Sequence, residues 1–201
     1  MNIKDKIKSK KGGTMLIIII CSLLIVSIAI IPSLIDTSYS RIASKKLKNY
    51  SYNAANSAVI VAPEIKIDGS VVYHPDKGEQ AMKSYFESLF DETFQRVAKP
   101  IENSQYYSVA YKNSSGTIAF QYIFYPKVLN LSMPTKDMIN DTVLTSSDGS
   151  KFSNSKMANS AYINKPGATI ILRYDSKTSD GDINSEVRIA TSRDNYYDRY
   201  K

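Results

Sequence analysis

The sequence predicts an α+β fold in which a long N-terminal helix precedes a small antiparallel sheet packed with one helix. Three observations carry this prediction. Residues 15–35 form an apolar run, a helical apolar period continues as far as Ala62, and the second half of the chain contains alternating apolar segments separated by turn residues.

The apolar run MLIIIICSLLIVSIAIIPSLI contains 14 Leu, Ile and Val among its 21 residues. At about 0.3–0.6 kcal/mol each, these residues favour membrane insertion, and about 1.5 Å per residue covers roughly 31 Å. We therefore predict a transmembrane helix over residues 14–35. A cleavable signal peptide is the alternative, but its apolar region is usually about 7–15 residues long. The first small-x-small site, Ser38-Tyr39-Ser40, also follows the charged Asp36.

The charge distribution predicts the orientation. Residues 1–13 carry five lysines and one aspartate, which is +4 of the total +7. The positive-inside rule places this basic leader in the cytoplasm and the C-terminal domain outside, at the cell membrane. Basic residues from Arg41 to Lys48 weaken the bias, so an intracellular domain is the alternative. The charges beyond residue 35 are dispersed, which predicts no nucleic acid as a partner. The basic leader predicts membrane lipid as a partner.

Residues 36–62 are predicted to continue the helix as an amphipathic segment. No Gly or Pro interrupts it before Pro63, and Pro32 should kink the combined helix of about 48 residues. The apolar stripe needs a partner, either the chain's own domain or neighbouring helices. Two alanines would allow another helix to approach closely, and three larger residues would anchor it. These candidate partner-helix contacts are Ile42, Leu47, Tyr50, Ala54 and Ala58.

The leader KSKKGG, the apolar span and the helix ending LKNYSYNAANSAVIVA together resemble the Tad (tight adherence) pilus proteins, closest to the TadE/TadF/TadG-type minor pilins and pseudopilins. The resemblance covers about the first 62 residues. It implies a pilin-like architecture and a membrane-anchored structural component of a Tad-type pilus or related secretion assembly. The implied partners are other subunits of that assembly, contacted through the N-terminal helix.

The resemblance also implies possible leader processing at Gly12 or Gly13. Processed members of the family carry a glutamate at the fifth position after the cleaved glycine. Here that position holds Ile17 or Ile18, and neither can supply the intramembrane carboxylate. This departure favours an uncleaved accessory subunit that stays in the membrane.

Residues 63–201 are predicted to form the extracytoplasmic α+β domain. After Pro75, Asp76-Lys77-Gly78-Glu79 resembles a capping box, so Asp76 is expected to cap a helix whose apolar stripe runs from Met82 to Val97. Four strands in two hairpins should follow, separated by a mostly exposed loop that holds one short helix. The ranges are 105–111, 117–125, 168–174 and 186–191 for the strands, 127–167 for the loop, 129–144 for its helix and 194–201 for a tail or edge segment.

Candidate chemistry is sparse. His74 is the only histidine and Cys21 the only cysteine, so we interpret them as a turn residue and a packing residue. We predict no catalytic site, no cofactor, no metal and no small-molecule substrate, and therefore not an enzyme. Fifteen tyrosines suit contacts between proteins. The alternative function is a membrane-tethered binding module for cell-wall or small-molecule ligands, which requires a concave pocket and a helix folded back on the domain.

Overall fold

The computed structural model describes residues 19–24, 26, 43–152, 160–178 and 180–194. The chain divides into two compact units, residues 1–42 and 43–201, which are considered separately. In the first unit, residues 19–24 are helical and Cys21 is exposed. Within the described residues, no helix is both long enough and apolar enough to span a bilayer.

The predicted fold class is therefore wrong in its N-terminal part. The chain is α+β with a large antiparallel sheet, but the long apolar N-terminal helix is absent from the described residues, whose first helix is short. Residues 43–61 are helical, and the apolar side chains on one face of this helix pack in the core against the sheet. The predicted kink at Pro32 and the glycines at 12 and 13 lie outside the described residues.

The main sheet has six antiparallel strands, where about four were predicted. The strand order is β10-β9-β6-β5-β3, and β4 also pairs with β5. Both predicted hairpins form, but β9 and β10 are longer than expected. The bounds are β3 Phe94–Arg96, β4 Ile101–Glu102, β5 Tyr107–Asn113, β6 Ile118–Tyr125, β9 Gly167–Lys177 and β10 Ile183–Arg193.

Helix α2 (Pro75–Phe90) begins close to the predicted start, but its N-cap is His74 and not Asp76, so the predicted capping box is wrong. The helix ends seven residues before Val97. Asp91 adopts the left-handed conformation, with φ 53° and ψ 40°, and so terminates the helix.

The chain then turns back, and β3 pairs with β5 through Phe94 and Asn113. Phe94 was expected to reach the core from the helix. It does lie in this core, but it belongs to strand β3.

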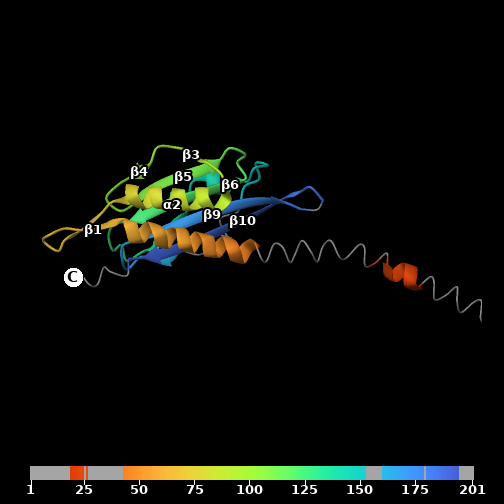
Figure 1. Cartoon of the computed structure of the whole chain (residues 1–201), viewed down its shortest axis with the longest axis horizontal. Coiled ribbons are helices and arrows are strands. Elements are labelled where there is room, and N and C mark those ends of the chain that lie inside the picture. Colours follow the sequence, from red (N-terminus) through yellow and green to blue (C-terminus); the bar gives the residue numbers. More distant parts are fainter. Residues whose placement is uncertain (1–18, 25, 27–42, 153–159, 179, 195–201) are drawn as a thin grey trace, which may run out of the picture. The chain divides into compact units, whose positions relative to one another are not determined.

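Helix 43–61 and α2 lie on one face of the sheet (Figure 1). Their apolar faces meet the sheet in a core that includes Ala54, Met82, Phe86 and Phe120, all fully buried. A short hairpin, β1 (Pro63–Ile65) and β2 (Val71–Tyr73), connects the two helices.

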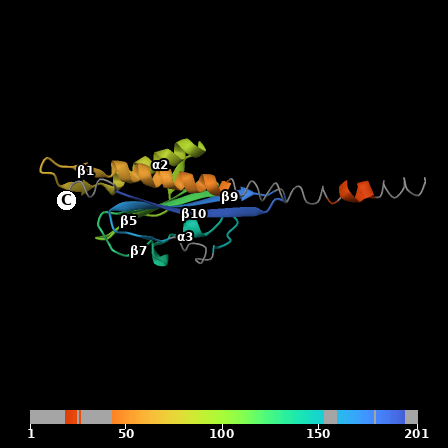
Figure 2. The same cartoon turned by 90° about the horizontal axis from the view of Figure 1, so that it is seen from below.

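The opposite face is covered by the segment between β6 and β9 (Figure 2). This segment was expected to be mostly exposed, yet Met133, Val143 and Ile163 are buried in a second core. These apolar residues are far apart in the sequence. They form a core because each packs against the same face of the sheet. The segment's elements are β7 Ser132–Met133, the 3-10 helix η1 Lys136–Met138, α3 Asp141–Leu144 and β8 Ala161–Tyr162.

Candidate functional sites

The predicted partner-helix contacts lie inside the chain's own domain. Leu47 is 3% exposed and Ala54 and Ala58 are fully buried. Tyr50 packs edge-on against Phe90, with ring centroids 6.3 Å apart. Ile42 lies outside the described residues. The sequence left two partners open for the apolar stripe, namely the chain's own domain or neighbouring helices. In the structure, the stripe packs against the sheet and α2 of its own domain.

A different set of apolar side chains is exposed in this part of the domain. Of the eight large hydrophobic residues that are exposed in the described part of the second unit, five fall between positions 52 and 67. Ile67, at the turn between β1 and β2, is completely exposed. We call these five residues the outer apolar set: Tyr52, Ile60, Val61, Ile65 and Ile67.

A buried carboxylate joins α2 to the sheet. Glu79, on α2, accepts hydrogen bonds from the hydroxyl groups of Tyr107 and Tyr111 and from the guanidinium of Arg96. Only 6% of its side chain is exposed. Three donors from β3 and β5 thus compensate the cost of removing one charge from water.

The ionisation of the donors reflects this environment. Burial, followed by the hydrogen bond to Glu79, raises the pKa of Tyr111 to about 12. The same two causes raise the pKa of Tyr107. The hydrogen bond with Tyr111 and then that with Glu79 raise the pKa of Arg96. Both tyrosines are therefore neutral donors at physiological pH, and the cluster is a fixed structural junction.

His74 belongs to an exposed ion-pair group at the start of α2. Its Nε2 atom is 3.0 Å from a carboxylate oxygen of Glu64, and the Nζ atom of Lys77 is 2.8 Å from the same oxygen. The hydrogen bond from Lys77 is the main cause of the lowered pKa of Glu64. Across the described ranges, no group of three His, Cys, Asp or Glu side chains is arranged to hold a metal ion.

The domain contains a polar cavity of about 440 Å³ at the end of the sheet where β5 turns into β6. Its lining combines two cations, Lys112 and Arg173, with one carboxylate, Asp141. Most of the remaining lining consists of hydroxyl side chains. They are Ser114, Ser115, Thr142, Thr145, Ser146 and Ser147.

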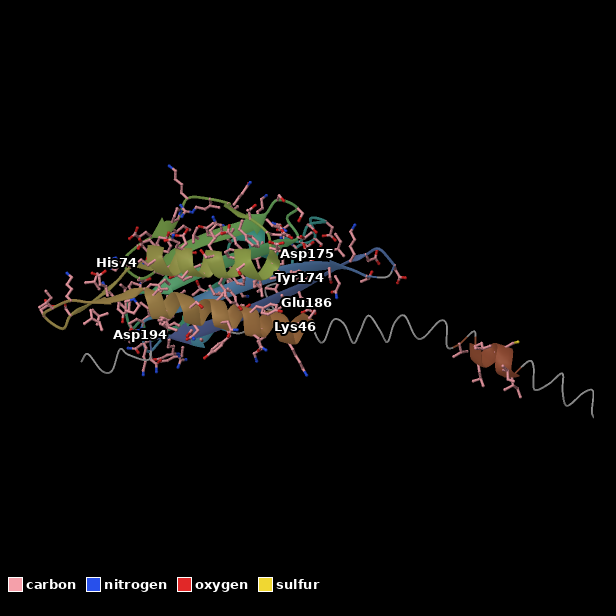
Figure 3. All side chains as sticks on the ribbon, in the orientation of Figure 1. Lys46, His74, Tyr174, Asp175, Glu186 and Asp194 are labelled. Carbon is pink, nitrogen blue, oxygen red and sulfur yellow. The ribbon has the colours of Figure 1, made fainter. Side chains whose placement is uncertain are left out.

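Arg173 and Asp175 form a buried ion pair beside the cavity. Their side chains are 2% and 1% exposed. Arg173 also donates from Nη2 to the carbonyl of Gly116 at 2.7 Å, and the amide of Ser147 donates to Asp175 at 2.7 Å. The pair therefore connects β9 to two loops. Figure 3 places Asp175 and His74 towards opposite ends of the domain.

The strand register explains why the two cations share a face. Lys112 of β5 pairs with Ala119 of β6, and Ala119 pairs with Arg173 of β9. Directly paired residues in adjacent strands point to the same face of a sheet. Ala119, with only a methyl group, lies between the two long side chains, and α3 covers this part of the sheet.

Neither the cavity nor the Glu79 cluster was anticipated from the sequence. One signal was present, since Arg173 and Asp175 alternate with Leu172 and Tyr174 in an otherwise apolar strand. Two opposite charges on one face of a buried strand indicate a pair enclosed by another layer. The position of Lys112 near this pair could not be predicted from the sequence, because it depends on the register of β5, β6 and β9.

The chain was also compared with known proteins. No protein-family model matches it, and no curated protein or solved structure matches it.

Proposed function

We propose that this protein is a membrane-anchored structural subunit of a Tad-type pilus or a related secretion assembly, with its α+β domain on the extracytoplasmic side. In this proposal the apolar residues 15–35 anchor the chain and the basic residues 1–13 remain in the cytoplasm. The domain makes protein contacts and performs no chemistry of its own.

The observation that carries the proposal is the outer apolar set, because a tethered binding module equally requires the integration of helix 43–61 into the domain core. Only seven residues separate the end of the apolar run from Ala43, where the compact unit begins.

The outer apolar set supplies the proposed contact surface. Tyr52 and Ile60 are eight residues apart on one face of the helix, which corresponds to about two turns. Both are more than half exposed, at 53% and 61%. A contiguous exposed apolar patch marks a protein–protein contact site, and we propose that the outer apolar set forms one. We propose that another subunit of the assembly contacts this surface. Leu47, Ala54 and Ala58, contact positions suggested by the sequence, are buried in the domain, so the outer apolar set takes their place in the proposal.

Site-specific crosslinking tests the proposal. A photo-crosslinking residue is placed at Ile60 in the full chain, expressed from its own locus, and captured proteins are identified by mass spectrometry. We expect subunits of a pilus or secretion assembly to be captured. The same crosslinker at Ser84, an exposed position on α2 outside the outer apolar set, is the matched control and should capture no such subunit. Capture of lipid alone from Ile60 would contradict the proposal.

One observation favours the second candidate function, a tethered binding module. The domain has the concave polar cavity that such a module requires, and helix 43–61 does fold onto its own domain. The two functions are compatible in one chain, because the cavity and the outer apolar set involve different residues.

A further inference from the structure

The cavity beside Arg173 has no part in the structural role proposed above. We propose that it is a binding site for the phosphate ester of a small polyol or sugar. This inference does not depend on the pilus proposal, because it rests only on the cavity's side chains and their electrostatics.

Arg173 provides the first recognition element. A guanidinium has five N–H donors, and Arg173 uses Nη1 on Asp175 and Nη2 on the carbonyl of Gly116. Its Nε atom and the Oδ1 atom of Asp175 are both buried and have no hydrogen-bond partner among the described residues. Leaving buried charged groups unpaired is costly, so a ligand in the adjacent cavity that both accepts and donates hydrogen bonds would be favoured.

The charge balance selects an anion. Asp175 compensates Arg173. Asp141 is 81% exposed and lies 3.8 Å from the Nζ atom of Lys151, so its charge is offset on the solvent side.

Beside the lining, the carboxylate of Asp148 accepts hydrogen bonds from the Ser146 hydroxyl and the Ser150 amide. Lys112 lines the cavity from an exposed position on β5 and makes no ion pair within the described residues, so it is the unpaired charge of the lining. A phosphate group matches a lysine and an arginine that approach from two sides.

The hydroxyl lining selects what is attached to the phosphate. Serine and threonine hydroxyls both donate and accept hydrogen bonds, which suits the alternating donors and acceptors of a polyol. The described lining contains no aromatic ring on which a nucleobase could stack. A volume of about 440 Å³ falls within the usual range of about 300–1,000 Å³ for ligand sites and exceeds what one phosphate ion fills.

Titration calorimetry on the full chain in uncharged detergent tests this proposal. Three probes are compared at constant ionic strength, namely glycerol 3-phosphate, inorganic phosphate and glycerol. We expect saturable binding that is tightest for glycerol 3-phosphate, weaker for inorganic phosphate and undetectable for glycerol. An amide shift of Ser147 in NMR spectra should accompany binding, because this residue lines the cavity.

The variant Lys112→Gln removes the unpaired charge of the lining from an exposed position, so the fold should be retained and circular dichroism verifies this. We expect about tenfold weaker binding of glycerol 3-phosphate. Lys66→Gln is the matched control, since Lys66 is an exposed lysine in the β1–β2 turn at the other end of the domain. Its affinity should be unchanged.

Three results would overturn the proposal. They are the absence of saturable binding by any probe, equal weakening in Lys66→Gln and Lys112→Gln, and glycerol binding as tightly as its phosphate. Equal affinity for inorganic phosphate and glycerol 3-phosphate would overturn the assignment to an ester. None of these results bears on the crosslinking from Ile60, so the two proposals fail independently.

Discussion

At the scale of single residues, two adjacent positions on α2 fix how this helix meets the sheet. Glu79 accepts three side-chain hydrogen bonds from the sheet, and Gly78 lets the hydroxyl of Tyr122 approach. A Cβ atom at position 78 would lie 2.3 Å from that hydroxyl and 3.1 Å from the carbonyl of Ala58. The helix therefore approaches both the sheet and helix 43–61 closely at this point.

The variant Glu79→Gln should destabilise the domain by roughly 2–4 kcal/mol, because hydrogen bonds to a charged group are worth about 1.5–3 kcal/mol each and the amide retains only part of them. Urea denaturation of the full chain measures the change. Glu64→Gln is the control, since Glu64 is half exposed and should give no measurable loss. Equal stability of the two variants would contradict the assigned role.

The variant Gly78→Ala should cost about 1–3 kcal/mol, although alanine favours helices over glycine by about 1 kcal/mol. The clash between the new Cβ atom and the hydroxyl of Tyr122 costs more than the higher helix propensity of alanine gains. Tyr122→Phe removes a buried hydroxyl that has no described partner and should relieve part of the loss in the double variant. Ser84→Ala, an exposed position on the same helix, is the control and should be neutral or slightly stabilising. A stabilising Gly78→Ala would refute the close approach.

The raised pKa of Tyr111 predicts that the folded domain loses stability at alkaline pH. Its folded pKa, about 12, lies above the value of about 10 in an unfolded chain. Its contribution is therefore complete below pH 10 and declines as the pH rises towards 12. The free energy of unfolding, measured between pH 8 and 11.5, should fall above pH 10. Tyr111→Phe should give a shallower decline, and an unchanged slope would exclude Tyr111 as a cause.

At the scale of elements, helix 43–61 is held to the domain by its apolar face. Leu47 anchors its first half, and Ala54 and Ala58 allow the second half to pack closely. Two polar contacts reach β10, since Arg188 donates to Ser44 and Ser192 donates to Asn56 at 3.3 Å. The helix is thus a part of the domain's core.

The variant Leu47→Ala should destabilise the second unit by about 2–4 kcal/mol, because it leaves a cavity in a packed core. Tyr52→Ala, on the exposed side of the same helix, should change stability by less than about 0.5 kcal/mol. Thermal unfolding of the two full-length variants measures the difference. If Leu47→Ala were neutral, the apolar stripe would have to face another protein.

The elements also show how far the sequence predicts the fold. The start of α2 was predictable because Pro75 and Asp76 act locally. Its end was not, because Phe94 continues the helical period and only its pairing with Asn113 makes it a strand. The second core was missed since Met133 and Ile163 are brought together by long-range contacts. The cavity was missed for the same reason, as Lys112 and Arg173 meet only through strand register.

At the scale of the whole molecule, the second unit consists of a six-stranded sheet between two cores. The helical side contains helix 43–61, which follows the apolar run 15–35 in the sequence (Figures 1 and 2). The other side contains the polar cavity. This separation lets one domain serve two proposed roles, namely assembly through the outer apolar set and ligand binding beside Arg173. Both roles require helix 43–61 to remain docked, since it completes the core that supports the sheet.

Hydrogen exchange of the full chain measures this docking directly. If helix 43–61 belongs to the core, its amides from Leu47 to Ala58 should exchange as slowly as those of β6, because both open only with the whole domain. A helix that is merely adjacent would exchange rapidly while β6 stays protected. Matched slow exchange is the predicted result, and rapid exchange confined to 47–58 would contradict the integration of the helix into the domain.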